Sequence, residues 1–184
     1  MLKKIELLYL YIIRVKMCKV YSVLNHNRVD DSQEMIIIRG LPGSGKSTKG
    51  LMMVDNGEAD ELIEADQFFV EPDGTYNYDG DKIREAHNDC RQRTSQGLSD
   101  GKNIVVANTF VYRWQMQPYL DYCRENGINV KVICLYNSGL TPLQLHERCV
   151  HSVPLDTIQL WYDTYEVDWE NADPTPPWMR NKES

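Results

Sequence analysis

The stretch that decides the fold reads Met35-Ile-Ile-Ile-Arg39-Gly40-Leu-Pro-Gly-Ser-Gly45-Lys46-Ser47-Thr48. An apolar, β-branched run leads directly into a segment that satisfies the pattern G-x-x-x-x-G-K-S/T at every fixed position. Glycines allow backbone angles closed to other residues, so successive N–H groups can converge on phosphate oxygens. The helix that we expect next, from Lys46 to about Val54, adds the positive end of its dipole. The sequence therefore predicts a phosphate-binding loop between a strand and a helix.

This loop predicts a nucleoside triphosphate ligand, ATP, together with Mg²⁺. Lys46 can reach the β- and γ-phosphates, and the Ser47 hydroxyl can ligate the metal. The competing interpretation is a glycine-rich turn that binds nothing, which the flanking strand and helix disfavour. We expect nucleotide contacts from Gly40, Pro42, Gly43, Ser44, Gly45, Lys46, Ser47 and Thr48.

The rest of the chain alternates short β-like runs with helical segments, which is typical of a parallel sheet with helices on its faces. We expect strands at Met35–Arg39, Glu61–Ala65, Asn103–Ala107 and Asn129–Tyr136. The expected helices cover Lys46–Val54, Asp81–Gln96, Arg113–Glu125, a segment opened by Thr141-Pro142, and Leu155–Glu166. We expect Ile83 on the inner face of the second helix, a stop of the third at Asn126-Gly127, and a capping box between Thr141 and Gln144 in the fourth. A surface turn or small hairpin is expected between Phe68 and Tyr78, where Pro, Asp and Gly separate aromatic runs.

The length of 184 residues suits a single domain. We expect this domain at residues 35–167, preceded by an extension at 1–34 whose status the sequence leaves open. A proline-containing, loosely held tail is expected at 168–184. The first thirteen residues faintly resemble a signal peptide, but the apolar run is short and lacks a small-residue cleavage site.

Charge and cysteine content narrow the class of protein. The formal net charge of −7 disfavours binding along long stretches of duplex. Binding of a nucleic-acid end or of a small substrate is still compatible with this charge. The five cysteines form no C-x-x-C pair, so we expect reduced thiols and a cytoplasmic protein. No run of about 18 apolar residues indicates a membrane span.

Polar residues follow the second and third expected strands at the edge where ligands bind in such sheets. Asp66 could accept the proton of an attacking hydroxyl or help to position Mg²⁺, or it could be a loop or N-cap residue. Asn108 and Thr109 could contact the γ-phosphate, a metal-bound water or the acceptor, or form a turn. No acidic residue ends the third strand, so an ordinary Walker-B aspartate is missing.

Arginines supply the remaining candidates. Arg148 follows the Thr141 helix, where P-loop kinases carry a lid, and could stabilise charge on the transferring phosphoryl group. A surface arginine paired with a nearby acid is the alternative. Arg84, with Arg91 and Arg93, could hold substrate phosphates or form a solvated face. A helix-end hydrogen bond and a catalytic role are equally compatible with His151, whereas we expect His87 to be a helix-packing histidine.

Taken together, several stretches resemble the phage-type polynucleotide 5′-kinase family and the polynucleotide-kinase-like domain of animal ubiquitin-ligase-binding proteins. They occur in order over residues 35–166: the strand and loop at 35–48, Ala65-Asp66-Gln-Phe-Phe69, Gly74-Thr-Tyr-Asn-Tyr78, Glu85-Ala-His-Asn88, Asn108-Thr109 and Arg148-Cys-Val-His-Ser-Val-Pro154.

The resemblance implies a three-layer α/β P-loop NTPase fold of the kinase type, with a mainly parallel four-stranded sheet and a helical lid. It implies transfer of the γ-phosphoryl group of ATP to a polynucleotide 5′-hydroxyl. Lys46 and Ser47 would hold ATP and Mg²⁺, Asp66 matches the general base, and Arg148 falls in the lid region. By this resemblance Lys46, Asp66 and Arg148 are catalytic, and Asp66, Arg84, Asn108 and Thr109 bind the acceptor.

The sequence also departs from the family pattern. Gln67 stands where phage-type kinases often carry an acid, and Phe69 where they carry an arginine for the substrate phosphate. Ala107 and Phe110 replace polar residues at the end of the third strand. These departures leave two alternatives open: a kinase for a nucleoside or small hydroxyl compound, and an ATP-binding interaction module whose tail, with Trp169 and Trp178, contacts a partner.

Overall fold

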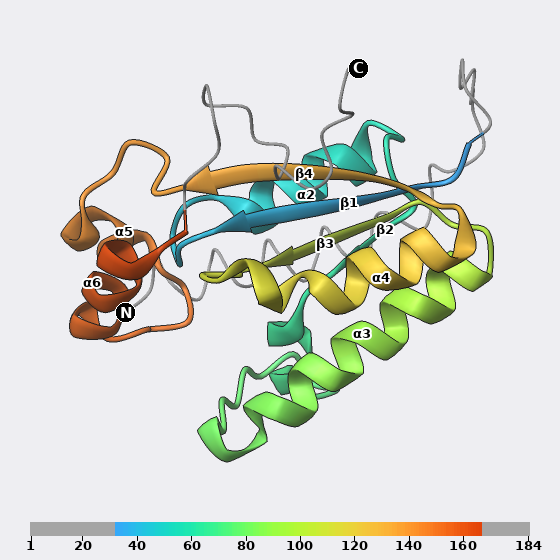
Figure 1. The fold of residues 1–184 in the computed structure, drawn as a ribbon. Coiled ribbons are helices and arrows are strands. Elements are labelled where there is room, and N and C mark those ends of the chain that lie inside the picture. The colour runs from blue at the N-terminus through green and yellow to red at the C-terminus, as the bar shows by residue number, and fades with distance from the viewer. Residues whose placement is uncertain (1–31, 167–184) are drawn as a thin grey trace, which may run out of the picture.

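A computed structural model describes residues 32–166 of the chain. Most of the expected N-terminal extension, the tail at 168–184, and the two tail tryptophans lie outside these residues. The described elements form a parallel sheet with helices on both faces, as the alternating sequence pattern predicts (Figure 1). No helix within the described part is long and apolar enough to cross a membrane.

The sheet has four parallel strands in the order β2-β3-β1-β4. These are β1 (Glu34–Gly40), β2 (Glu61–Ile63), β3 (Ile104–Asn108) and β4 (Asn129–Tyr136). In the register, Ile37 of β1 lies between Val106 of β3 and Val132 of β4. β1 is therefore a central strand, and its carboxyl end delivers the phosphate-binding loop to the middle of the sheet edge.

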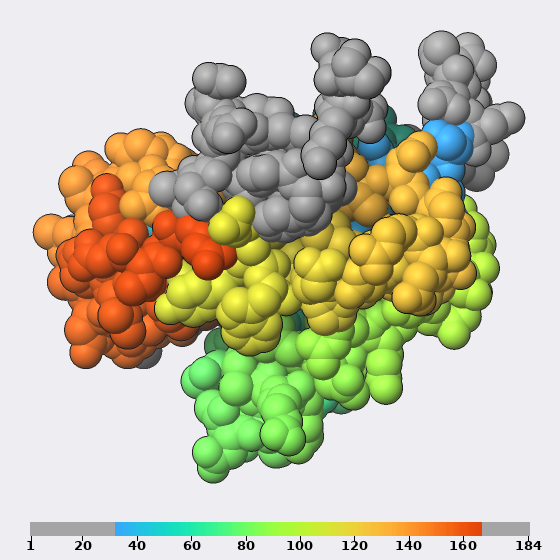
Figure 2. All heavy atoms as spheres, in the orientation of Figure 1, coloured from blue at the N-terminus to red at the C-terminus, as the bar shows by residue number. Residues whose placement is uncertain are grey.

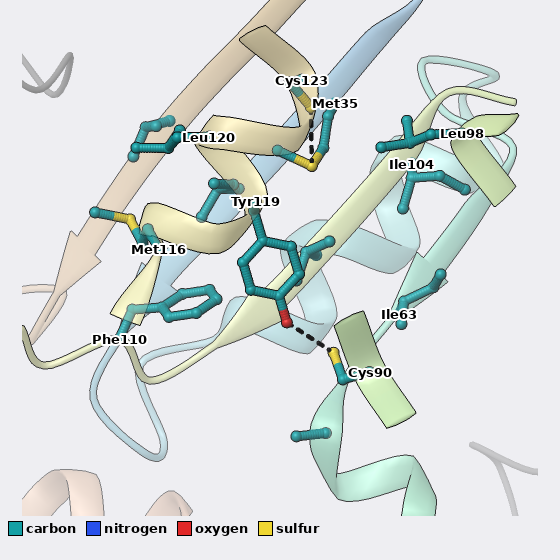
Figure 3. Close-up of a cluster of buried hydrophobic side chains, with 14 residues drawn as sticks. Met35, Ile63, Cys90, Leu98, Ile104, Phe110, Met116, Tyr119, Leu120 and Cys123 are labelled. Carbon is teal, nitrogen blue, oxygen red and sulfur yellow. Dashed lines mark hydrogen bonds between the residues drawn. The ribbon is translucent and has the colours of Figure 1, made fainter. Parts of the chain in front are cut away.

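Two helical layers cover the sheet (Figure 1). Helix α2 (Lys46–Asp55) lies on one face, and α3 (Ile83–Ser99) and α4 (Gln117–Asn126) lie on the other. Side chains alternate along a strand, so Ile36 and Ile38 pack in the cluster that includes Met53 of α2. Ile37 instead packs in the cluster with Cys90, Tyr119 and Leu120 of the opposite layer, part of which Figure 3 shows.

Two further helices gather at the end of the molecule to which the strands point, and Figure 2 shows their atoms together at that end. They are α5 (Pro142–Arg148) and α6 (Leu155–Thr164). Leu145 and Ile158 are fully buried against Leu41 of the phosphate-binding loop. The Thr141 backbone N–H donates to Gln144 Oε1 at 2.9 Å, which completes the expected capping box. The expected helical lid thus rests directly on the loop.

The second strand is shorter than the sequence suggested. The expected strand extended to Ala65, but β2 ends at Ile63, and a 3₁₀ turn covers Ala65–Phe69. The Gln67 side chain causes this turn, because its Oε1 accepts from the Glu64 backbone N–H at 3.1 Å and its amide donates to Leu62 O at 3.1 Å. Asp66 is therefore carried on a tight turn and not on the strand itself.

Two helix starts also differ from the expectation. Gly80–Lys82 forms a separate 3₁₀ turn capped by Asp79, so α3 begins at Ile83, whose side chain is exposed and not on the expected inner face. Arg113–Gln115 is likewise a 3₁₀ turn, and α4 begins later because Pro118 suits a first helical turn. The Asn126-Gly127 stop is confirmed, with Gly127 in the left-handed conformation at φ 67°.

Candidate functional site

The phosphate-binding loop joins β1 to α2 and leaves the start of α2 free of any side-chain cap. The first N–H groups of a helix have no partner within the helix. Gly45 at the cap position has φ 95°, and a Cβ built there would meet nothing within 4 Å. The N-terminus of this ten-residue helix has no side-chain cap and is accessible at Gly45, so its N–H groups can bind a polyphosphate.

The opposite side of the loop is closed. Gly43 has φ 77°, and a Cβ there would lie 2.2 Å from the Leu145 carbonyl oxygen of α5. The Ser138 hydroxyl donates to Ser44 O at 2.7 Å, while Pro42 and Ser44 are buried. The loop is therefore held in shape by contacts with α5 and with the segment after β4, before any ligand binds.

Lys46 and Ser47 begin α2. The Lys46 ammonium donates to Leu41 O at 3.0 Å across the loop, and burial lowers its pKa against the opposing charges of Glu64 and Asp66. Thr48 is exposed in the same first turn, and Gly40 donates its N–H to Thr109 O at 3.2 Å. A cation with a lowered pKa, held among acids, is placed to meet phosphate charge.

Asp66 lies at the carboxyl edge of the sheet, where the 3₁₀ turn after β2 places it. Its carboxylate accepts from the Tyr76 hydroxyl at 3.4 Å and lies 3.7 Å from His151 Nε2. The rings of Tyr76 and His151 pack at 4.5 Å between centroids. The structure thereby brings Asp66 together with Tyr76, from the segment before α3, and with His151, from the segment between α5 and α6.

Glu64 is a site residue that the sequence interpretation missed. Its side chain is 7% exposed, and its Oε1 accepts from the Ser47 hydroxyl at 2.6 Å. Burial raises the pKa of Glu64 to about 7, with the charge of Asp66 adding to the effect. The signal was an acid between the apolar Ile63 and Ala65 in an expected strand, because acids are seldom buried without a partner or ligand.

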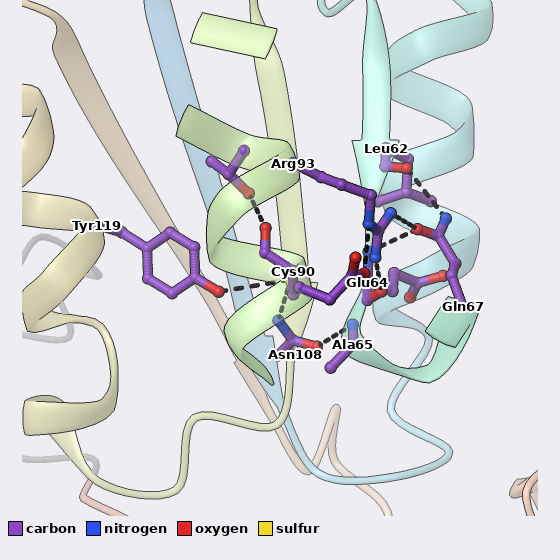
Figure 4. Close-up of polar contacts among 10 residues, drawn as sticks. Leu62, Glu64, Ala65, Gln67, Cys90, Arg93, Asn108 and Tyr119 are labelled. Carbon is purple, nitrogen blue, oxygen red and sulfur yellow. Dashed lines mark hydrogen bonds and ion pairs between the residues drawn. The ribbon is translucent and has the colours of Figure 1, made fainter. Parts of the chain in front are cut away.

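Arg93 holds the backbone around Glu64 (Figure 4). Its guanidinium donates to Glu64 O at 3.0 Å and to Gln67 Oε1 at 2.7 Å, and it pairs with Asp89 at 2.7 Å. These contacts are internal, so we assign Arg93 to positioning of the turn. The sequence left open a phosphate contact or a solvated face for Arg93, and the structure instead uses its guanidinium for these internal contacts.

At the end of β3, Asn108 is 6% exposed and engaged on both sides. Its Oδ1 accepts from Ala65 N at 2.9 Å, and its Nδ2 donates to Cys90 Sγ at 3.4 Å (Figure 4). Asn108 is therefore a positioning residue, whereas the sequence had suggested a direct contact with the acceptor as one alternative. Thr109 uses its carbonyl oxygen to hold Gly40 and the Tyr165 hydroxyl, and its own hydroxyl makes no hydrogen bond within residues 32–166.

Of the remaining arginine candidates, Arg84 and Arg148 are exposed, whereas Arg91 is half-buried and donates to Asn88 Oδ1 at 3.4 Å. Arg148 ends α5 and makes no ion pair or hydrogen bond in the described part of the chain, including with Glu147 and Asp156. Arg84 lies in the first turn of α3, one turn before His87. Burial lowers the pKa of His87, and the charge of Asp66 partly opposes this shift, so this part of α3 faces the Asp66 side of the site.

A parallel sheet with a phosphate-binding loop at the end of its central strand, a lysine and serine at the following helix, and a helical lid define a P-loop kinase fold. Residues 35–139 match the sequence profile of the AAA domain family AAA_33, which covers more than half of the chain. The chain belongs to this family, and membership in this P-loop family implies ATP binding.

Individual relatives are distant. Human NEDD4-binding protein 2 is 25% identical over 138 residues, which are 72% of this chain but only 8% of that protein. A chain in the structure of the Pnkp1/Rnl/Hen1 RNA repair complex superposes with a TM-score of 0.57 and 16% identity, covering 77% of this chain and 47% of the other. A chain in a second structure of the Pnkp1/Rnl/Hen1 complex superposes with a TM-score of 0.53 and 18% identity, covering 67% of this chain and 41% of the other. These likenesses concern the fold.

Proposed function

We propose that this protein transfers the γ-phosphoryl group of ATP to the 5′-hydroxyl of a polynucleotide. The observation that carries the proposal is the position of Asp66, whose carboxylate lies near Lys46 at the mouth of the loop and beside an aromatic surface. A kinase acceptor site needs a proton acceptor facing the outermost phosphate.

In the proposed reaction the acceptor oxygen attacks the γ-phosphorus while the bond to the β–γ bridging oxygen breaks, and ADP leaves. Asp66 takes the proton of the acceptor hydroxyl. Lys46 and the amides at the start of α2 offset negative charge on the phosphates, and Arg148 closes over them. Mg²⁺ bound with ATP would add further charge compensation at Ser47.

The choice of acceptor rests on the aromatic side chains around Asp66. Phe68 and Tyr78 are exposed large aromatics at this site, and the buried Phe69 packs against Tyr78 at 5.1 Å between centroids. Phe69 also contacts the rings of Phe68 and Tyr76, and Tyr76 contacts His151, so these side chains form one aromatic cluster whose exposed members are Phe68 and Tyr78. A nucleobase can stack on such a surface for roughly 1–3 kcal/mol, whereas a sugar or polyol has no π face to offer.

The deciding experiment supplies radiolabelled ATP and Mg²⁺ with matched acceptors: a 5′-hydroxyl oligonucleotide, the same oligonucleotide carrying a 5′-phosphate, its component nucleosides, and a sugar panel. We expect label on the 5′-hydroxyl oligonucleotide alone. Exclusive labelling of nucleosides or sugars would replace this acceptor by a small molecule.

Variants then test the roles of the residues. Asp66→Asn should lower transfer by roughly 10²–10⁴-fold because the proton acceptor is lost, with ATP affinity retained. Lys46→Ala should weaken both ATP affinity and transfer. The exposed Lys49, one turn farther along α2, supplies the control Lys49→Ala, which should behave as wild type. Near-normal turnover in Asp66→Asn would remove Asp66 from the mechanism.

A second candidate is a kinase for nucleosides or other small hydroxyl compounds. Phe69 favours it, because this side chain is buried and cannot supply the phosphate contact of an arginine at that position. The same acceptor panel separates the two candidates, since nucleosides would then be phosphorylated at least as well as the oligonucleotide. Tight ATP binding with no labelled acceptor would instead favour an ATP-binding interaction module.

A further inference from the structure

The described structure contains a buried carboxylate in contact with the serine of the phosphate-binding loop. Glu64 Oε1 accepts from Ser47 Oγ at 2.6 Å, and the Glu64 side chain is 7% exposed. The Glu64 side chain also takes part in the capping box of the 3₁₀ turn, in which it accepts from the Gln67 backbone N–H, but no Lys, Arg or His among the described residues lies within ion-pair distance of it. Buried carboxylates without such a cation commonly have a metal or another ligand as their counter-charge.

The strand end that normally carries a metal-binding carboxylate has no acidic residue in this chain. P-loop NTPases hold Mg²⁺ with the loop Ser or Thr and an aspartate at the end of a strand. Here β3 ends in Ala107 and Asn108, and Asn108 is committed to Ala65 and Cys90. The neighbouring strand β2 ends immediately before Glu64.

We propose that Glu64, which directly follows β2, is the carboxylate that positions Mg²⁺ in this site through the Ser47 hydroxyl. A serine hydroxyl can donate its hydrogen to a carboxylate while its lone pairs face a cation. Glu64 is thus a positioning residue, and this assignment deepens the proposed kinase function and rests on its use of Mg²⁺ with ATP.

The surroundings of Glu64 support a fixed rather than an adaptable position. Gln67 and Arg93 hold its backbone N–H and carbonyl group, and Arg93 is itself paired with Asp89. The main chain of Glu64 is therefore fixed by the 3₁₀ turn and by α3, while its Oε1 is directed to Ser47 at the start of α2. Supporting contacts of this kind are what orient metal ligands in proteins.

The experiment measures metal binding without catalysis. Electron paramagnetic resonance quantifies free Mn²⁺ titrated into the full chain with a non-hydrolysable ATP analogue, and calorimetry measures binding of the analogue in EDTA. Glu64→Gln keeps the size of the side chain but removes its charge. We expect this variant to bind Mn²⁺ roughly 10–100-fold more weakly, as is typical for such supporting residues. Affinity for the analogue in EDTA should stay within about twofold of wild type.

Two further variants separate metal positioning from packing. Glu61→Gln makes the same change at the start of β2, at an exposed residue paired with Lys102, and should leave Mn²⁺ affinity unchanged. Glu64→Asp retains the charge but shortens the side chain. If Glu64 acts on the metal, Mn²⁺ affinity should rank wild type, then Asp, then Gln; a packing role would place Gln above Asp.

Wild-type Mn²⁺ affinity in Glu64→Gln, or the ranking with Gln above Asp, would overturn the assignment. The failure of the kinase proposal looks different. If wild type labels no acceptor but Glu64→Gln still loses Mn²⁺ affinity, then Glu64 keeps its role and only the proposed reaction falls. If wild type transfers phosphate and Glu64→Gln binds Mn²⁺ normally, the reaction stands and Glu64 loses its role.

Discussion

Burial is the largest influence on the pKa values of Lys46 and Glu64 at this site, and it shifts the two in opposite directions. Lys46, Glu64 and Asp66 act on one another through their charges, while burial lowers the pKa of Lys46 and raises that of Glu64 to about 7. Both shifts favour the neutral forms, because burial penalises charge more than the neighbours compensate. A triphosphate with a divalent cation would bring the missing counter-charges to both sides.

His87 offers a test of this arrangement without nucleotide. Burial lowers its pKa, and Asp66 partly opposes the shift. We expect the His87 titration followed by NMR to have a midpoint below 6.5, and Asp66→Asn to lower it further. Between the His87 midpoint of the folded protein and the higher midpoint of the unfolded chain, the folded protein binds fewer protons than the unfolded chain. His87 therefore reduces stability as pH falls through this range.

A His87 midpoint at or above 6.5, or one indifferent to this substitution, would show that His87 does not sense Asp66.

At the scale of elements, the site depends on how α5 meets the phosphate-binding loop. The backbone of Gly43 packs on the Leu145 carbonyl group, and Leu41 contacts the buried face that α5 and α6 share. The helical lid is therefore packed against the loop and can transmit a change in either part to the other.

Gly43→Ala tests this packing. The substitution combines a left-handed backbone with a Cβ only 2.2 Å from Leu145 O, so α5 or the loop must shift. We expect a loss of roughly 2–4 kcal/mol in the free energy of unfolding, measured by urea denaturation, and weaker ATP binding. Gly101→Ala is the control, since Gly101 has a similar φ of 79° but open space around its Cβ. Its cost should be about 1 kcal/mol, from backbone strain alone. Equal losses for both variants would mean that the contact with α5 is unimportant.

At the scale of the whole molecule, β1 links the two cores to the site. Its alternate side chains enter the clusters on opposite faces of the sheet, and its carboxyl end becomes the phosphate-binding loop. Damage to this strand should therefore lower the stability of the whole domain and not of one layer alone.

Ile37→Ala should lower the free energy of unfolding by roughly 2–5 kcal/mol, because it leaves a cavity at a fully buried position of the central strand. Leu160→Ala, on the exposed surface of α6, should change it by less than about 0.5 kcal/mol. Both values follow from denaturant unfolding monitored by circular dichroism. Comparable losses would contradict the assignment of Ile37 to the core.

The sequence alone predicted the α/β class, the four strands and the loop, because these depend on local patterns. Strand periodicity, glycine spacing and the Thr141–Gln144 cap each act over a few residues. The end of β2 and the starts of α3 and α4 were less well predicted. After β2 and before α3, side-chain bonds from Gln67 and Asp79 compete with the regular backbone pattern.

The tertiary structure alone decided which polar groups meet. Glu64 reaches Ser47 because β2 ends beside the start of α2, and Asp66 lies next to His151 because α5 and α6 fold back over the sheet edge. Asn108 turns inward because Ala65 N and Cys90 Sγ lie within its reach. Local patterns do not encode such distances, since each depends on the packing of segments far apart in the chain.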